Sequence, residues 1–489
     1  MKVISTIFFL SISLNILFAQ QSINFNEFFI NATMRIDYYH IGDAKEEFIT
    51  IDKIYKEGVW AGSTNQLLDT YKLGRYYIKV YDLETNLLIF SKGFDSYFSE
   101  YKNTTLAIEG IKRTYHESAL IPFPKRKIQF TIEKRNLNNS LIQIFSSIIE
   151  PNDIYIYEKS ISPSIKIRQI YKNGKPHEKV DIVYIAEGYT EKEENKFFAD
   201  AEKFSKVFFA QEPYKSYQNR FNIYAVFKPS AQNGCDEPSY GIFKNTVINA
   251  SFDSLGSARY LLTEDNKKLR DIAAAVPYDA IVILVSQKRY GGGGIYNLYA
   301  ITVTDNQWSD YIFLHEFGHS FTGLADEYYT SSVTYNEFYP KNIEPLEPNI
   351  TALLEPTQLK WKDLCSKNID IPTPWEKEEF DKMDTEYQKI REELNKKITK
   401  LKKEKANSKE VYALENESEK LSKEHAIKID NFLNNRKYKN LVGAFEGAGY
   451  SSTGLYRSML DCIMFTKGVK PFCKACQQAI IKKINQYTK

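Results

Sequence analysis

The chain has 489 residues, of which 43% are hydrophobic and 26% are charged, and its formal net charge is +3. This length and composition indicate a globular protein with enough apolar residues for two domains with cores of their own. The nearly balanced charge argues against a dedicated polyanionic partner, and nucleic acid in particular is not suggested.

Residues 1–19 are typical of a secretory signal. Lys2 supplies the positive end, Ile7 to Phe18 form a short apolar core, and Ala19 offers a small residue for cleavage. Polar residues interrupt the core, which is too short for a clear membrane span. An uncleaved anchor is the alternative. We therefore expect an exported protein, secreted, periplasmic or at the cell surface, with no integral membrane segment after signal removal.

Residues 20–150 alternate between apolar and polar side chains in short bursts rich in aromatic and β-branched residues. This period-two pattern, with turn residues between the bursts, predicts an N-terminal antiparallel β-sandwich. The region shows no cluster of histidines and carboxylates, so we expect a packing or substrate-presenting role. The clearest bursts are 35–39, 76–81, 87–90 and 128–132.

Residues 151–489 begin with a linker near Pro151 and then show a different pattern. Continuous apolar runs here alternate with a helical stretch at about 192–209, which predicts an α/β layer with a mostly parallel sheet. The whole chain is thus expected to be a multidomain α+β or α/β protein. The runs are 181–186, 221–227 and 280–285.

The stretch His315-Glu316-Phe317-Gly318-His319 carries the most specific chemistry in the chain. On a helix that turns about 100° per residue, His315 and His319 lie one turn apart on one face, with Glu316 on the same side. Two imidazoles in fixed register beside a carboxylate are what a zinc hydrolase needs. The opposite side carries the apolar residues Leu314, Phe317 and Phe321.

A catalytic zinc site needs a third protein ligand, and Asp326 is the nearest candidate carboxylate. If the helix continued, Asp326 would lie roughly 10 Å further along the axis than His319, too far for one ion. Glycine readily adopts the left-handed conformation that ends helices. We therefore predict that the helix ends at Gly323 and that the chain folds back to bring Asp326 to the ion.

These residues carry a resemblance to known families. The pattern His-Glu-x-x-His, followed by a glycine and a third ligand, resembles the metzincin zinc endopeptidases, although Gly323 and Asp326 come one residue later than usual and aspartate replaces histidine. The longer string HEFGHSFTGLADEY resembles the IgA-peptidase-like metallopeptidases of bacteria, in which this spacing is normal. The likeness extends to Gly-Leu-Tyr-Arg at 454–457, Cys-Ile-Met at 462–464 and Phe-Cys-x-x-Cys at 472–476.

The resemblance implies a metzincin-like zinc metallopeptidase domain preceded by the N-terminal domain that accompanies this family. It implies that His315, His319 and Asp326 bind Zn²⁺ and that Glu316 is the general base for hydrolysis of a protein or peptide substrate. Met464, with Met459 as the alternative, would form the Met-turn beneath the histidines. Either Tyr450 or Tyr456 could donate to the oxyanion of the transition state, or serve only in packing.

Metzincins have an antiparallel edge strand beside the cleft, which holds extended substrate through main-chain pairing. Residues 298–303, immediately before the zinc helix, are the candidate for this strand. The four glycines at 291–294 lack the Lys-Ser/Thr of a phosphate-binding loop. We expect them to form a mobile loop that leads into the edge strand.

Residues 376–438 contain no glycine or proline and are densely charged. Apolar residues recur with a spacing of three or four from Phe380 to Leu401 and again from Val411, which predicts an antiparallel helical hairpin with a narrow apolar seam. We interpret this hairpin as an insertion in the catalytic domain, solvated or serving to dock a partner or large substrate. His425 is expected to be a packing residue.

Five cysteines occur, at 235, 365, 462, 473 and 476. An exported location favours disulfides, and Cys462 could pair with Cys473 or Cys476. A structural zinc held by these three thiolates is the second interpretation, for which the sequence shows no evident fourth ligand. Because the number is odd, at least one thiol is unpaired or forms an intermolecular bond.

Two functions therefore remain open. The first is an exported zinc-dependent endopeptidase that uses Glu316 as its base. The second is a catalytically silent protein of peptidase fold that binds or adheres at the cell surface, against which the intact His315, Glu316 and His319 argue.

Overall fold

The computed structural model describes residues 23–330, 339–340, 342–404 and 408–488. The expected secretory signal at 1–19 lies outside these residues. Across the described ranges, none of the helices combines the length and the apolar character that crossing a membrane requires.

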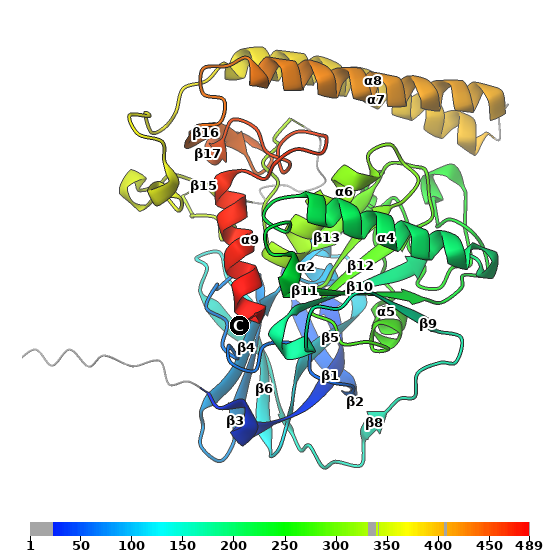
Figure 1. The fold of residues 1–489 in the computed structure, drawn as a ribbon, viewed down its shortest axis with the longest axis vertical. Coiled ribbons are helices and arrows are strands. Elements are labelled where there is room, and N and C mark those ends of the chain that lie inside the picture. Colours follow the sequence, from blue (N-terminus) through cyan, green and yellow to red (C-terminus); the bar gives the residue numbers. More distant parts are fainter. Residues whose placement is uncertain (1–22, 331–338, 341, 405–407, 489) are drawn as a thin grey trace, which may run out of the picture.

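The N-terminal part consists of two four-stranded sheets that face each other, seen in the lower half of Figure 1. Side chains of both sheets meet in the shared core: the ring of His40 in the first sheet lies 5.2 Å from that of Tyr76 in the second. The first sheet has the order β5-β1-β2-β8, with β1 (Phe29–Gly42), β2 (Glu47–Glu57), β5 (Arg113–Pro124) and β8 (Ile156–Glu158). The second has the order β4-β3-β6-β7, with β3 (Tyr76–Asp82), β4 (Leu88–Phe94), β6 (Ile128–Arg135) and β7 (Leu141–Ile149).

The pairing in both sheets is antiparallel, as alternation predicts, with one exception. β8 lies beyond residue 150 and pairs in parallel with β2. The chain reaches it from β7 in the opposite sheet. Three short helices complete this part: α1 (Phe25–Phe28), α2 (Tyr97–Tyr101) and α3 (Thr105–Ile108).

The following part is built on a six-stranded sheet with the order β13-β14-β12-β10-β11-β9. The four central strands are parallel and wholly or largely buried, which is why they are continuous apolar runs in the sequence. The two edge strands, β9 and β13, are antiparallel to their neighbours. The bounds are β9 (Lys166–Tyr171), β10 (Val180–Glu187), β11 (Phe221–Phe227), β12 (Ala280–Val285), β13 (Gly292–Ile295) and β14 (Tyr299–Val303).

Three helices pack on this sheet. Phe313 of α6 (Ser309–Phe317) contacts both Tyr184 of β10 and Phe204 of α4 (Glu194–Ala210), so these two helices cover the same face. α5 (Asn266–Ala273) joins the sheet to the N-terminal part, because Asn266 donates to the hydroxyl of Ser118 in β5 at 2.8 Å. The mixed α/β architecture with several sheets is as predicted.

The edge-strand prediction was wrong. The segment 298–303 forms β14, which pairs on both sides, in parallel with β12 and antiparallel with β13, and so has no free edge. The edge strand is β13, formed by the glycines predicted to be a mobile loop. Glycine has low strand propensity and no side chain to contribute to an alternating pattern, so the sequence gives no signal for this strand.

The glycines of β13 lie directly against the helical segment that carries Ile312, Glu316 and His319. A Cβ atom at Gly294 would come within 2.4 Å of the carbonyl oxygen of Glu316 and 2.9 Å of the Cβ of His319. At Gly292 it would come within 2.5 Å of the side chain of Ile312. Glycine in a strand commonly marks such a close backbone approach.

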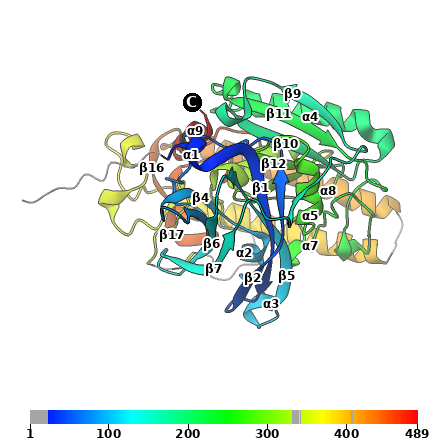
Figure 2. The same ribbon diagram turned by 90° about the horizontal axis from the view of Figure 1, so that it is seen from below.

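α7 (Lys377–Lys403) and α8 (Ser408–Asn434) lie side by side and project over the sheet domain, as both views show (Figures 1 and 2). Their contacts run in opposite directions along the chain: Tyr387 stacks on His425, with ring centroids 3.9 Å apart, and Lys402 pairs with Glu415 at 2.6 Å. Ile390, which the spacing places in the seam, is 51% exposed. That α7 and α8 are an insertion stays a prediction.

A small sheet and a last helix complete the chain. The sheet has the order β15-β17-β16, with β15 (Ile350–Thr351), β16 (Val442–Ala448) and β17 (Ser451–Met459), and it is followed by α9 (Lys474–Tyr487). α9 packs beside the helical turn that follows α6, where the rings of Phe321 and Tyr487 stack with centroids 6.0 Å apart.

The contact between β13 and α6 predicts a cost for any side chain at Gly294. Gly294→Ala should lower the free energy of unfolding by about 1–3 kcal/mol, because the added methyl group overlaps backbone that cannot move aside. Thermal unfolding of the purified protein measures this.

Gly58→Ala is the matched control, since a Cβ there meets nothing within 4 Å. Equal unfolding temperatures for the two variants would contradict the proposed close approach.

Candidate active site

The motif His315-Glu316-Phe317-Gly318-His319 lies at the end of α6, where the helix changes from α to π winding. His315 and Glu316 are in the α-helix, whereas His319 falls in a π-helical turn over Gly318–Thr322. The apolar side of the motif is buried as predicted, and Phe317 stacks on Phe321 with ring centroids 5.2 Å apart. Because this apolar side is packed, the helix cannot turn about its axis, and the two histidines stay on the opposite side.

The helical segment ends at Gly323, which has the left-handed conformation with φ 70°. The chain then folds back in an extended segment, and Asn349 holds it there by accepting a hydrogen bond from the Ala325 amide at 2.8 Å and donating one to the Ala325 carbonyl at 2.9 Å. Asp326 follows directly. Its Oδ1 atom lies 2.9 Å from Nε2 of His315 and 3.2 Å from Nε2 of His319.

The two imidazole rings are oriented by backbone carbonyls. Nδ1 of His315 lies 3.0 Å from the carbonyl oxygen of Ile463, and Nδ1 of His319 lies 2.6 Å from that of Leu324. A carbonyl oxygen only accepts, so each Nδ1 carries a proton and donates it, and Nε2 is the ring atom turned toward Asp326. The two Nε2 atoms lie 3.1 Å apart and converge with the Asp326 oxygen.

Three ligand-type atoms that converge on one point could hold a metal ion. The donor set of two imidazoles and one carboxylate is that of catalytic zinc sites, and the separations of 2.9 to 3.2 Å are close to the edge of about 3.3 Å that zinc–ligand distances imply. The residues therefore fit Zn²⁺.

The charges at this point are strongly coupled. Burial lowers the pKa of His319, but the Asp326 carboxylate outweighs burial and raises this pKa to about 9. Burial raises the pKa of Asp326, whereas the positive charges of His319 and His315 hold that pKa well below its usual range. The group thus holds a proton strongly at the point where the three ligand atoms meet, as expected of a site shaped for a positive charge.

Glu316 lies beside this group in a cavity of about 250 Å³. Burial raises the pKa of Glu316, against the opposing charges of His315 and His319. The cavity is also lined by Gly292 and Gly294 of β13 and by side chains of α7 and α8. A water molecule or a peptide group in the cavity can therefore reach both the histidine pair and Glu316.

Of the two candidate tyrosines, the structure places Tyr450 at the site. Its hydroxyl donates to Oδ2 of Asp326, and the side chain lines the cavity. Tyr456 lies in β17 opposite Thr351 and does not line the cavity. Tyr450 is therefore placed to orient the carboxylate, a contact known to support ligand geometry in metal sites.

Met464 rather than Met459 lies beneath the histidines. A Cβ atom at Gly318, between the two histidines, would come within 3.2 Å of the Met464 sulfur, and Met464 is fully buried. The sulfur of Met459 instead accepts from the amide of Lys474 at the start of α9. The turn at 462–464 also supplies the Ile463 carbonyl that orients His315.

The sequence did not predict several residues that lie near the site. Asn349 and Arg259 could not be identified from the sequence, because neither is close to the motif along the chain. Arg259 donates to the hydroxyl of Tyr328 at 3.1 Å on the cavity wall. His425 does pack, on Tyr387, but it also lines the cavity and lies 2.7 Å from Asp384.

Comparison with known families agrees with this geometry. Residues 168–484 match the family described as IgA Peptidase M64, and residues 24–146 match the family described as Peptidase M64 N-terminus. The chain belongs to the IgA peptidase M64 family. Membership means a peptidase of metallopeptidase type that acts on protein substrates. No curated protein matches the chain.

The M64 site predicts an effect of removing one hydroxyl group. Tyr450→Phe should raise the free zinc concentration needed for half-maximal peptidase activity by about 10- to 100-fold, because Asp326 loses the donor that orients it. Activity measured in zinc buffers of graded free concentration gives this value.

Tyr456→Phe is the control and should leave the zinc dependence unchanged, because Tyr456 lies off the cavity. A Tyr450→Phe variant with reduced activity at saturating zinc and an unchanged zinc dependence would instead assign the hydroxyl to substrate.

Proposed function

We propose that this M64 peptidase is an exported zinc-dependent endopeptidase. The observation that carries the proposal is the convergence of Nε2 of His315, Nε2 of His319 and Oδ1 of Asp326, with both Nδ1 atoms engaged by backbone carbonyls. Export is proposed from the sequence of residues 1–19 alone.

In this proposal His315, His319 and Asp326 hold Zn²⁺, and Glu316 is the general base. The ion, when bound, polarises the substrate carbonyl and lowers the pKa of a water molecule towards neutrality. Glu316 takes a proton from the attacking water and passes it to the leaving amine. Burial raises the pKa of Glu316, which strengthens the carboxylate as a proton acceptor for the first of these transfers.

This mechanism predicts that Glu316→Gln folds, retains zinc and loses hydrolysis by about 10²- to 10⁴-fold, because general base catalysis is removed while the ligands stay. Turnover of a diverse peptide library by the purified protein, with zinc content measured in parallel, tests both points.

Wild type treated with a chelator is the second arm and should be equally inactive until zinc is restored. Hydrolysis by Glu316→Gln at the wild-type rate would refute the assignment of the base. A zinc-replete wild type that hydrolyses none of the library would favour the alternative of a silent binding protein.

We further propose that α7 and α8 help to select the substrate. Tyr387, Gln388 and Arg391 of α7 line the same cavity as Glu316, and so do Ser422 and His425 of α8. α8 is anchored to the body of the domain next to the cavity, since Lys467 donates to Ser422 at 3.2 Å. A substrate in the cavity would therefore contact α7 and α8.

The wall on this side of the cavity is cationic. Arg259, Arg391 and Lys467 all line it, and burial together with the other two positive charges lowers the pKa of Lys467 well below its usual range. Burial and the charge of Arg259 also lower the pKa of Arg391. Arg259 and Arg391 line this wall together with the carboxylate of Asp384, and their guanidinium groups are placed to pair with an acidic side chain of the substrate on this side of the scissile bond.

Arg391→Gln should lower kcat/KM about tenfold for peptides with an acidic residue on that side of the cleavage site, while leaving neutral peptides unaffected. The loss corresponds to one charge-assisted hydrogen bond. Profiling of matched acidic and neutral peptides measures the ratio.

Lys389→Gln removes the same charge two residues away on an exposed part of α7 that does not line the cavity. It should leave the ratio unchanged. A ratio that stays constant in Arg391→Gln would show that Arg391 does not select the substrate.

A further inference from the structure

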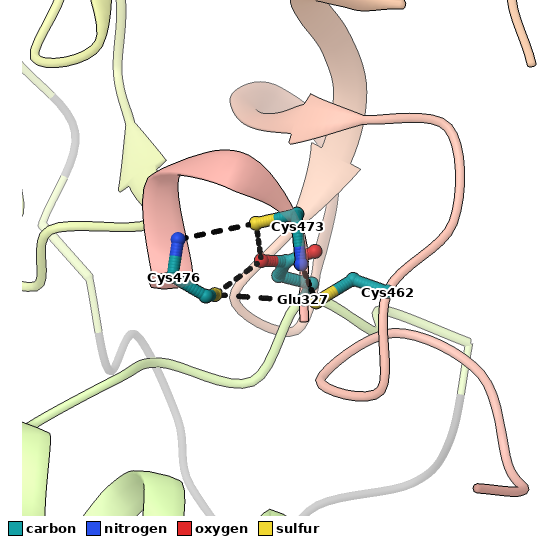
Figure 3. A group of neighbouring side chains, drawn as sticks. All are labelled: Glu327, Cys462, Cys473 and Cys476. Atoms are coloured by element: carbon teal, nitrogen blue, oxygen red, sulfur yellow. Dashed lines mark hydrogen bonds between the residues drawn. The ribbon is translucent and has the colours of Figure 1, made fainter. Parts of the chain in front are cut away.

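A second group of ligand-type side chains lies behind the active site. Glu327, Cys462, Cys473 and Cys476 come from three segments of the chain, and their ligand atoms all lie within 4.8 Å of one another. Figure 3 shows the four side chains pointing toward a common centre. All four are buried, with at most 1% of any of them exposed. The fourth ligand that the sequence did not reveal is Glu327.

The distances in this group suit a tetrahedral metal ion. Sγ of Cys462 lies 3.9 Å from Sγ of Cys476, and Oε1 of Glu327 lies 3.5 Å from Sγ of Cys473 and 3.4 Å from Sγ of Cys476. Zinc–sulfur bonds of about 2.3 Å and zinc–oxygen bonds of about 2.0–2.2 Å give tetrahedral edges of about 3.8 Å and 3.5 Å. A disulfide would need its two sulfur atoms at about 2.0 Å.

Backbone amides point at the sulfur atoms. Sγ of Cys462 accepts from the amides of Met464 at 3.4 Å and Cys473 at 3.1 Å, and Sγ of Cys473 accepts from the amide of Cys476 at 3.4 Å. Cys473 is also the N-cap of the 14-residue helix α9, whose N-terminus favours negative charge. Amide donors and a helix N-terminus favour the thiolate of Cys473, and the thiolate is the form of cysteine that binds metals.

One oxygen of the buried Glu327 carboxylate lacks a partner. Oε1 accepts hydrogen bonds from Asn349 at 3.0 Å and from the thiols of Cys473 and Cys476, whereas Oε2 is buried and has no hydrogen-bond partner among the described residues. A buried carboxylate beside three sulfur atoms is costly unless a positive charge compensates it. A divalent cation at the centre of the group would supply that charge.

We propose that Glu327, Cys462, Cys473 and Cys476 bind a structural Zn²⁺ ion, separate from the catalytic one. Four protein ligands close the coordination sphere, which is the mark of a structural site, and binding releases the protons of the thiols. The ion would tie α9 and the turn at 462–464 to the segment that carries Asp326. It would thereby fix the Ile463 carbonyl that orients His315.

The test begins with the full-length wild-type protein in which cobalt replaces zinc. Thiolate ligands give an intense sulfur-to-cobalt charge-transfer band in the near ultraviolet, whereas two histidines and an aspartate give none. The proposal expects this band in the wild type and in Asp326→Asn, which disables only the catalytic site. Absence of the band from fully cobalt-loaded wild type would refute the proposal.

Zinc stoichiometry provides the second measurement. Cys476→Ser should lose about half of the zinc bound by the wild type, Asp326→Asn should lose the other half, and Cys365→Ser should lose none because Cys365 lies outside the group. If Cys476→Ser does not fold, the cobalt spectrum of the wild type still decides. A wild type whose zinc is lost entirely in Asp326→Asn would overturn the proposal.

Thiol counting separates the metal site from a disulfide. Wild type denatured in a chelator without reductant should expose all 5 cysteines to alkylation. Two thiols that react only after reduction, and that map to Cys462 with Cys473 or Cys476, would establish a disulfide in place of the ion.

Discussion

The reversal of the chain at Gly323 is the constraint on which the site depends. A left-handed residue ends the helical segment four residues after His319, and the extended segment beyond it runs back along the histidines. In an extended chain consecutive side chains point to opposite sides. Asp326 therefore reaches the two histidines, while Glu327 reaches the three cysteines on the other side. One turn thus serves both groups of ligands.

The turn at 462–464 has the same double role. The Ile463 carbonyl orients His315, Met464 packs against Gly318, and Cys462 joins the cysteine group. The Glu327 amide donates to the Met464 carbonyl at 2.8 Å, so the two segments also hold each other directly. Movement of either segment would disturb both sites. The glycines of β13 add a third close contact with the helical segment that carries His315 and His319. Such support on several sides is what keeps ligands in place before the metal binds.

The walls of the cavity come from more segments of the chain than the ligand-type residues do. The ligand-type residues and Glu316 come from one short motif, but the walls come from β13, Tyr450 and the helices α7 and α8. A long, charged pair of helices would be expected on composition alone to be solvated. Instead, α7 contributes Phe380, Asp384 and Arg391 to the cavity wall. The apolar seam between α7 and α8 holds that wall in position. Fold and chemistry are shared with the family, whereas substrate choice depends on such walls.

The sequence by itself determined the features that are local. The spacing of His315, Glu316 and His319, the glycine that ends the helix, the buried parallel strands and the alternating N-terminal strands all follow from backbone periodicity and from the preferences of single residues. Only the tertiary structure decided which residues from distant segments meet. The glycine strand β13, Asn349 behind Asp326, Tyr450 on its carboxylate and Glu327 among the cysteines could not be read from the sequence, because each depends on contacts between segments that are remote along the chain or, for Glu327, on the direction in which a turn points its side chain.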